Sequence, residues 1–280
     1  MFDLVRQLLT LRPEDETTNF QNVARLVDFL KDYGTYPPFF EVQQGVNEPE
    51  CVIDGRPYIM FAANNYLSLS GHPAVKEAAI RAIERYGVGP GGSRVMSGNV
   101  EVIVELERRI AALVGKEDCL TFPTGYMANV TVFQALMGSY LGRLPYETKE
   151  SVIFIDELIH GSALDGCRLS PAKTVTFGHN DLEDLEARLE EHASMGNKLI
   201  VTEGVYCLEG EIVDMPRYVE LARAYKAKLM VDDAHAIGVL GSRGGGSPDH
   251  HDCADGIDIV MGCMDKAMGG RAATYAATRP

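Results

Sequence analysis

The chain of 280 residues carries 26 Lys and Arg against 40 Asp and Glu, which gives a formal net charge of −14, and 46% of its residues are hydrophobic. This composition is typical of a globular protein that can bury a large core, and it excludes fibrous and disordered classes. An acidic balance without a cluster of basic residues argues against binding to nucleic acid or to an anionic membrane surface. We therefore expect small molecules and proteins as partners.

The cysteines and the apolar segments indicate the compartment. No CxxC pair occurs, so we expect reduced thiols rather than a disulfide framework, and a cytoplasmic protein. The first residues lack the pattern of a signal peptide, and no run approaches the roughly 18 apolar residues of a membrane span. The six cysteines are Cys51, Cys119, Cys167, Cys207, Cys253 and Cys263.

The first part of the chain reads as an arm that precedes the main domain. Residues 1–48 are polar, the apolar spacing of residues 20–30 predicts a helix, and the prolines within residues 35–40 predict a break. Residues 49–280 then form the main domain, which opens on a hairpin whose turn is Asp54-Gly55.

Helical and strand patterns alternate through the rest of the chain. Amphipathic helices and short apolar runs in strict succession predict an α/β fold with a mainly parallel sheet covered by helices on both faces. A ligand would bind at the carboxyl ends of the strands. The expected helices cover residues 74–87, 102–115, 180–193 and 216–227 and a segment after residue 125; the expected strands cover 119–123, 151–156, 173–177, 198–204, 228–235 and 258–264.

Lys266 follows one of these apolar runs and precedes small residues that leave room for a bulky group. A lysine at the end of a buried strand can form an imine with an aldehyde cofactor, because desolvation lowers its pKa toward nucleophilic reactivity. Taken alone, the residue is far more typical of a solvated surface charge, since unpaired lysines are almost never buried.

The segment that ends in Asp232, Asp233 and His235 is more informative. A carboxylate there can pair with a protonated pyridine nitrogen, and an imidazole three residues later can reach the ring's phenolic oxygen, as a pyridoxal phosphate site requires. A metal site is the alternative, with the acidic and histidine residues 249–252 as further ligands. A polar surface loop is the simpler interpretation of residues 249–252.

Two further strand ends carry candidate residues. After the strand near residue 122, the backbone N–H groups of Gly125 and Tyr126 at a helix N-terminus could hold a phosphate. His160, four residues after Asp156, could lie flat against an aromatic cofactor ring, although an ordinary structural histidine fits the same pattern.

Taken in order, several motifs resemble the α-oxoamine synthase family of pyridoxal-phosphate enzymes, which have fold type I. The match covers residues 50–275 in unbroken order. Members join an amino acid to an acyl thioester, usually acyl-CoA, with loss of CO2. The motifs are NNYLSLSGHP (64–73), GVGPGGSR (87–94), GYMAN (125–129), DELIHGSALDGCRLS (156–170), FGHND (177–181), TEGVYCLEG (202–210), VDDAHAIGVLG (231–241) and DKAMGG (265–270).

The resemblance implies a role for each matching residue. Lys266 would form the imine with pyridoxal 5′-phosphate and act as the base, and Asp232 would pair with the pyridinium nitrogen. His235 would bond the ring oxygen, His160 would stack on the ring, and Asn64 would touch the substrate carboxylate.

Further cofactor contacts follow from the same resemblance. The amides of Gly125 and Tyr126 would hold the phosphate, and Glu203, Cys207 and Cys263 would lie beside the cofactor. The motif at residues 87–94 would approach the neighbouring subunit's site, which implies a homodimer.

Departures from the family pattern motivate a second hypothesis. Cys207 stands where a serine is usual, Cys263 replaces a threonine that binds phosphate, and Asp265 brings a carboxylate close to that phosphate. These changes are typical of a non-catalytic partner or regulatory subunit, whereas retention of Lys266 favours an enzyme.

The length of the chain corresponds to only part of the length of a typical family member. Relatives continue beyond the cofactor lysine with a small C-terminal domain that usually supplies an arginine for the substrate carboxylate. We therefore expect this chain to be a fragment, or a member that lacks this domain.

Overall fold

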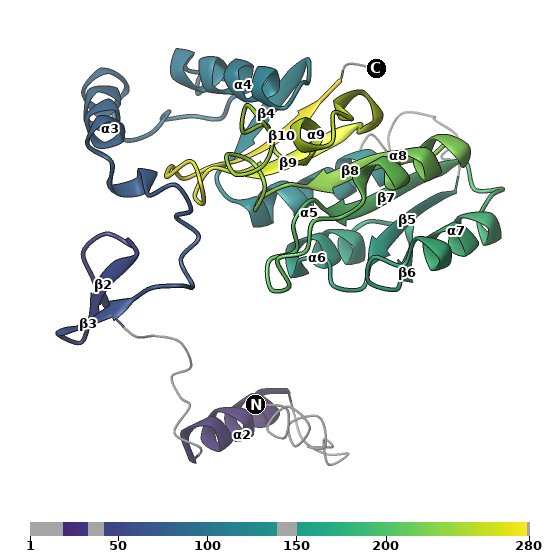
Figure 1. Ribbon diagram of the computed structural model, residues 1–280, viewed down its shortest axis with the longest axis horizontal. Helices are drawn as coiled ribbons and strands as arrows, with labels where there is room; N and C mark the ends of the chain where they lie inside the picture. The colour runs from purple at the N-terminus through teal and green to yellow at the C-terminus, as the bar shows by residue number, and fades with distance from the viewer. Residues whose placement is uncertain (1–18, 33–41, 139–149, 279–280) are drawn as a thin grey trace. The chain divides into compact units, whose positions relative to one another are not determined.

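The computed structural model describes residues 19–32, 42–138 and 150–278 (Figure 1). The chain divides into two compact units. The first consists of residues 1–45 and 50–59, and the second of residues 46–49 and 60–280. The proline-rich break expected at residues 35–40 lies outside the described residues.

The described residues of the first unit form one helix and a small antiparallel sheet. Helix α2 covers Asn19–Asp32, and strands β1 (Gln43–Gln44), β2 (Glu50–Ile53) and β3 (Arg56–Ile59) pair in that order. Asp54 and Gly55 both have positive φ, 48° and 76°, which is the backbone that a tight two-residue turn between twisted strands requires. The predicted hairpin and the predicted helix at residues 20–30 are both confirmed.

The second unit contains a seven-stranded sheet flanked by helices (Figure 1). The strands lie in the order β4-β10-β9-β8-β7-β5-β6. The strands are β4 (Asp118–Phe122), β5 (Ser151–Asp156), β6 (Lys173–Phe177), β7 (Asn197–Glu203), β8 (Lys228–Asp232), β9 (Ile259–Cys263) and β10 (Ala273–Ala277). The helices are α3 (Pro73–Tyr86), α4 (Glu101–Leu113), α5 (Gly125–Met137), α6 (Gly161–Leu169), α7 (Leu182–Glu191), α8 (Met215–Ala224) and α9 (Ser247–His250), with short 3-10 turns at Leu69–Gly71 and Ala254–Gly256.

The mainly parallel sheet predicted from the sequence is confirmed, with one strand reversed. Strands β5 to β9 pair in parallel, whereas β10 runs antiparallel to both β9 and β4. Only residues 264–272 connect β9 to β10, and a connection this short has no room for the crossover that a parallel pair needs. Lys266 lies in this tight connection.

The alternation of side chains along each strand builds two cores, one on each face of the sheet. In β8, Leu229 and Val231 belong to the core under α4, α7 and α8, whereas Met230 belongs to the core under α5 and α6. Because successive side chains point to opposite faces, Asp232 points to the same face as Met230.

The same alternation determines which strand-end residues meet. In β7, Leu199 and Val201 lie in the α5–α6 core, so Glu203 points to that face. In β9, Met261 and Cys263 both belong to that core. Three strands therefore direct a polar or thiol side chain to one edge of one face, where α5 and α6 begin.

Close packing of α5 against α6 depends on a glycine. A Cβ at Gly166 would meet the ring of Phe133 and would lie 2.9 Å from the carbonyl oxygen of Asn129, both on α5. We expect Gly166→Ala to lower the free energy of unfolding by about 1–3 kcal/mol, because the two helices must separate. Urea unfolding measures this, with Gly161→Ala as control, since a Cβ at Gly161 has nothing within 4 Å. Equal stabilities of the two variants would contradict the prediction.

Candidate functional site

A cavity opens at the carboxyl ends of the parallel strands, where three strands and the starts of α5 and α6 come together. It gathers eight of the ten site residues that the sequence predicted. Asn64 and Cys207 do not line it. The lining residues are Thr124, Gly125, Tyr126, Asn129, His160, Ser162, Glu203, Asp232, Ala234, His235, Met261, Cys263, Asp265 and Lys266.

A hydrogen-bonded chain leads from Lys266 toward the surface. The Nζ of Lys266 lies 2.7 Å from Nε2 of His235, and Nδ1 of His235 lies 2.7 Å from the hydroxyl of Tyr66. That hydroxyl donates to Oδ1 of Asn64 at 3.3 Å. Asn64 is thus linked to the cavity through Tyr66, a residue that the sequence analysis quoted in a motif but gave no role.

The protonation of His235 follows from its surroundings. Burial and the positive charge of Lys266 lower the pKa of the His235 imidazole to about 4, so the ring is neutral at physiological pH. An ammonium group can only donate, so Nε2 of His235 accepts from Lys266 and Nδ1 carries the proton. The ring therefore accepts a hydrogen bond from Lys266 and donates one to Tyr66.

Asp232 is held by two donors, and these leave room for a third. Its Oδ2 accepts from the side-chain amide of Asn129 at 3.0 Å, and its Oδ1 accepts from the backbone N–H of Ala234 at 3.2 Å. A carboxylate has about four lone-pair positions, so both oxygens can still accept a hydrogen bond from a ligand. The neighbouring Asp233 faces away from the cavity and bonds the backbone and hydroxyl of Ser247 at 2.8 and 2.5 Å.

His160 caps helix α6 from the edge of the cavity. Its Nδ1 accepts from the backbone N–H of Ser162 at 3.2 Å and lies 2.7 Å from the Ser162 hydroxyl. Its own backbone N–H donates to Oε1 of Glu203 at 2.7 Å. His160 therefore has the structural role of a helix cap, and its ring nevertheless lines the cavity.

Glu203 is a carboxyl that holds its proton near neutral pH. Burial and, to a smaller extent, the negative charge of Asp232 together raise the pKa of Glu203 to about 8. A neutral carboxyl beside Asp232 avoids placing two adjacent buried charges in the cavity.

This raised pKa has a measurable consequence for stability. Between the ordinary pKa of 4.5 and the folded value of about 8, the folded protein holds a proton that the unfolded chain has lost. Stability should therefore fall as pH rises through this window, by up to about 1.4 kcal/mol per pH unit. Glu203→Gln has no such proton, so its urea-unfolding free energies should fall less steeply over the same pH series. Parallel pH profiles for the two proteins would contradict this assignment.

The first turn of α5 offers backbone donors to the cavity. The hydroxyl of Thr124 caps this helix by accepting from the N–H of Met127 at 3.2 Å. The first N–H groups of a helix have no partner within it, which leaves those of Gly125 and Tyr126 for an anion. A Cβ at Gly125 would lie 2.8 Å from Sγ of Cys263 and 2.9 Å from Cε of Met261, so the turn approaches β9 as closely as only glycine allows.

Of the three residues that depart from the family pattern, Cys263 and Asp265 line the cavity and Cys207 does not. Burial raises the pKa of the Cys263 thiol to about 12, and burial followed by the charge of Glu203 raises the pKa of Cys207. Both cysteines therefore remain thiols at neutral pH. Cys207 is exposed outside the cavity lining, whereas Asp265 is exposed on the lining itself, where solvent screens its charge.

The structure gives no support to the metal alternative. In residues 19–32, 42–138 and 150–278, no group of three His, Cys, Asp or Glu side chains could hold a metal ion.

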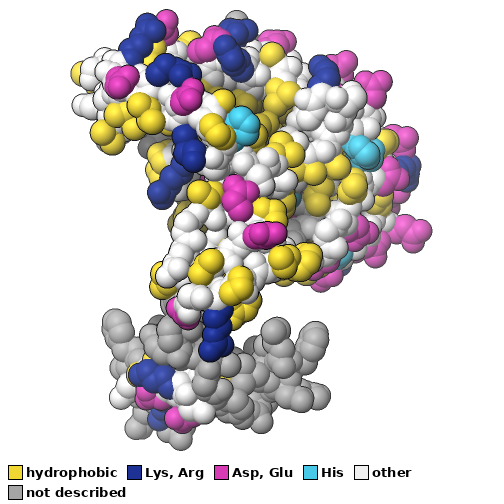
Figure 2. All heavy atoms as spheres, turned by 60° about the vertical axis from the view of Figure 1, so that its left-hand side comes forward, with side chains coloured by type: hydrophobic (Ala, Val, Ile, Leu, Met, Phe, Trp, Pro, Cys, Tyr) yellow, Lys and Arg dark blue, Asp and Glu magenta, His cyan; other side chains and the backbone are white. Residues whose placement is uncertain are grey.

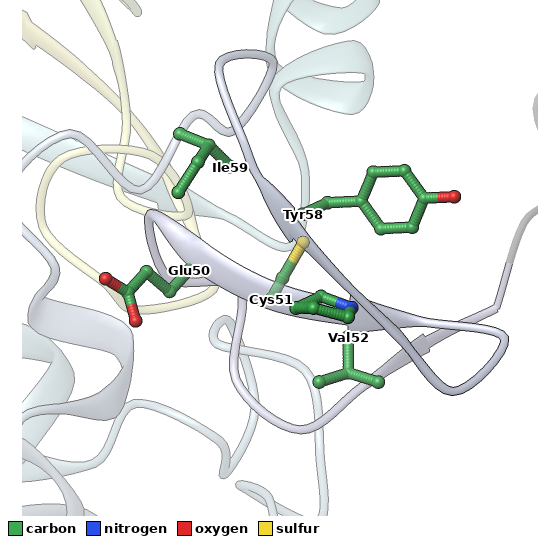
Figure 3. Close-up of a pocket in the computed structure, with 6 residues that line it drawn as sticks. Glu50, Cys51, Val52, Tyr58 and Ile59 are labelled. Atoms are coloured by element: carbon green, nitrogen blue, oxygen red, sulfur yellow. The ribbon is translucent and has the colours of Figure 1, made fainter.

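A second cavity, of about 380 Å³, lies on the hairpin of the first unit and is lined by residues of β2 and β3 (Figure 3). Its single carboxylate, Glu50, and its single thiol, Cys51, form no catalytic cluster. The cavity at the strand ends, which is lined by Lys266, Asp232 and His235, is the better candidate for the functional site.

Comparison with known proteins identifies the family. The family model described as aminotransferase class I and II matches residues 56–278. The chain belongs to the aminotransferase class I and II family. Its curated relatives place it among the α-oxoamine synthases, as the motifs predicted.

Three relatives illustrate this placement. A serine palmitoyltransferase of Sphingobacterium spiritivorum is 40% identical over 87% of this chain and 58% of its own length. An 8-amino-7-oxononanoate synthase of Geobacter sulfurreducens is 42% identical over 92% of this chain and 63% of its own length. The solved serine palmitoyltransferase from S. paucimobilis with a bound PLP–myriocin aldimine has a TM-score of 0.85 at 31% identity, and the match covers 95% of this chain and 65% of that one.

The chain thus spans about three fifths of the length of the curated relatives it matches. Pyridoxal 5′-phosphate is the cofactor of this family. The cavity fits this group, because it combines one amine, one carboxylate with free acceptor positions, and the N-terminus of a helix that approaches closely only through Gly125.

Proposed function

We propose that this protein is a pyridoxal-phosphate-dependent C-acyltransferase that joins an amino acid to an acyl thioester. The reaction forms one carbon–carbon bond, and it releases CO2 and the free thiol to leave an α-aminoketone. The observation that carries the proposal is the convergence of Lys266, Asp232, His160 and the α5 N-terminus on one cavity. When bound, pyridoxal phosphate supplies an aldehyde that condenses with amines and a protonated ring that withdraws electrons from the substrate carbon.

Lys266 acts as the amine that holds the cofactor and as the base for the substrate Cα proton. His235 supports this role, because its neutral Nε2 lies 2.7 Å from Nζ and orients the amine by accepting a hydrogen bond from it. Tyr66 lies next in the same chain and holds the imidazole in place through its Nδ1.

Asp232 keeps the cofactor ring protonated by presenting a negative charge to its nitrogen. Gly125 and Tyr126 hold the phosphate with their backbone N–H groups, and the positive end of the α5 dipole adds to this attraction. Glu203 and Cys263 lie beside the cofactor as uncharged groups at neutral pH, so neither competes with Asp232 for the ring nitrogen.

His160, which lines the cavity, would stack on the ring of the bound cofactor, and Cys207 would lie beside the cofactor. Asn64 orients the substrate carboxylate by means of its side-chain amide. Support for this role comes from its link to His235 through Tyr66, which ties the substrate-binding residue to the base. The amino acid is of the serine, glycine or alanine type, and the acyl donor is acyl-CoA or another acyl thioester.

We further propose that residues 49–280 form the cofactor-binding large domain after an arm at residues 1–48, and that two copies associate. Apolar side chains are exposed in and beside the glycine-rich segment: Val88 is 96% exposed, Val95 93% and Met96 84%. Figure 2, in which the side bearing α3 comes forward, shows hydrophobic side chains among charged ones. Exposed apolar side chains of this kind support association with a second copy.

Two findings bear on the location of the protein. None of the helices in the described part of the chain combines the length and apolar character that a bilayer crossing needs. All six cysteines are unpaired, and four of them are buried. Unpaired thiols persist in reducing compartments, which supports our proposal of a cytoplasmic location.

The decisive experiment measures release of free thiol from acyl-CoA in the presence of pyridoxal phosphate and one amino acid at a time. We expect CO2, free thiol and aminoketone in equal amounts with at least one of serine, glycine and alanine. Saturable binding of pyridoxal phosphate without any turnover would instead favour a non-catalytic member of the family. Absence of binding would overturn the proposal.

A further inference from the structure

Asn129 is a fully buried amide at the centre of the site, and the sequence analysis gave it no role. Its Nδ2 donates to Oδ2 of Asp232 at 3.0 Å and to Oγ of Ser162 at 2.9 Å. Its Oδ1 accepts from the hydroxyl of Tyr275. Both N–H groups and the carbonyl oxygen therefore have partners, which is the complete set that a buried amide needs.

The partners of Asn129 determine which way its amide points. Rotating the amide by half a turn would place its carbonyl oxygen against the carboxylate of Asp232, where two acceptors repel each other. Tyr275 can donate to the oxygen in the observed orientation. Because Asn129 is on α5, Asp232 on β8, Ser162 on α6 and Tyr275 on β10, one side chain links four elements of the fold.

The hydrogen bond from Asn129 to Ser162 also determines which ring nitrogen of His160 accepts a hydrogen bond. The oxygen of Ser162 accepts from Asn129, so its hydroxyl hydrogen is free to donate to Nδ1 of His160 at 2.7 Å. The backbone N–H of Ser162 points to the same nitrogen at 3.2 Å. With two donors directed at it, Nδ1 carries no proton, and the neutral ring carries its proton on Nε2.

We infer that Asn129 is a positioning residue that orients the Asp232 carboxylate and, through Ser162, selects the tautomer of His160. The inference rests on the proposed function, in which these two side chains contact the ring nitrogen and the ring face of the cofactor. A neutral amide suits this position, because an Arg or Lys would pair with Asp232 and weaken its attraction for a protonated ring nitrogen.

The test combines two readouts on the purified full chain. Long-range proton–nitrogen NMR spectra of the protein without cofactor report the tautomer of His160, whose signal is assigned by its loss in His160→Gln. Fluorescence titration with pyridoxal phosphate reports affinity. The variants are Asn129→Asp, Tyr275→Phe and, as matched control, Ser247→Ala, which removes a donor from the buried Asp233 outside the cavity.

We expect wild-type His160 to carry its proton on Nε2. Asn129→Asp should attract the Ser162 hydroxyl hydrogen to its new carboxylate, so that His160 becomes protonated at Nδ1, and should weaken cofactor binding about tenfold or more. Tyr275→Phe should weaken binding about threefold, since it removes only the bond that orients the amide. Ser247→Ala should lose stability and keep both the tautomer and the affinity of the wild type.

The inference fails if wild-type His160 carries its proton on Nδ1, or if Asn129→Asp leaves the tautomer unchanged. It also fails if Ser247→Ala weakens cofactor binding as much as the Asn129 variant does. If Asn129→Asp does not fold, Tyr275→Phe takes its place. Cofactor binding by Tyr275→Phe that is as tight as that of the wild type, or no weaker than that of Ser247→Ala, would then overturn the inference. Wild-type protein that binds no cofactor would overturn the proposed function, and the NMR measurement would still test the inference by itself.

Discussion

Lys266→Ala is expected to lose covalent attachment of pyridoxal phosphate and to lower turnover by roughly 10²–10⁴-fold or more, because a positioned base of this kind contributes at least that much. Lys266 is the one amine among the residues that line the cavity in the described part of the chain. No other lining side chain can therefore replace it. Reduction with borohydride followed by peptide mass spectrometry locates the attachment, and thiol release from acyl-CoA measures turnover.

Lys228→Ala is the matched control for this variant. Lys228 has a side chain that is 73% exposed and pairs with Asp258, so its loss should leave both attachment and turnover at wild-type levels. Attachment of the cofactor to any lysine other than Lys266 in the wild-type protein would show that the assignment is wrong.

Asp232→Asn is expected to weaken binding of pyridoxal phosphate on the order of 100-fold, which corresponds to about 2.7 kcal/mol. The carboxylate is buried, accepts hydrogen bonds from Asn129 and Ala234, and lines the cavity. An amide offers the ring nitrogen no charge, so the ring loses its proton and with it most of its ability to withdraw electrons. Turnover should therefore fall at least as far as affinity.

The neighbouring carboxyl provides the control. Asp233 is fully buried on the same strand end, but it bonds Ser247 and does not line the cavity. Asp233→Asn should lower the midpoint of thermal unfolding and leave cofactor affinity within about twofold of wild type. Similar losses of affinity in both variants would mean that Asp232 acts through general stability rather than through the cofactor.

Much of the fold could be predicted from the sequence, because the relevant signals are local. The turn at Asp54-Gly55 needs two residues that tolerate positive φ, and the predicted hairpin forms there. The apolar run of β8 and the amphipathic pattern of α8 likewise predicted elements that the structure contains. The reversed direction of β10 was not predicted. It depends on the short connection formed by residues 264–272 and on the place that β10 takes in the sheet, between β9 and β4.

The site was predicted in part. Strand-end residues such as Asp232 and Lys266 were recognisable because they follow buried runs, and they do line one cavity. Asn129, Tyr66 and Tyr275 were missed, because a polar residue carries no local sign of a hydrogen-bond partner that is distant in the sequence. Asn129 and Asp232 are 103 positions apart in the chain, and only packing of α5 on the sheet brings them together.

The sequence by itself determined the family, the order of the elements and the types of reactive side chain, since motifs and hydrophobic periodicity depend on neighbouring residues. Its acidic composition was the basis for expecting small-molecule partners, and the spacing of its cysteines predicted the free thiols that the structure shows. Only the tertiary structure decided which face each strand-end residue points to and which donor meets which acceptor. Those facts depend on strand parity and on helices that pack across the sheet, so they exist only once the chain has folded.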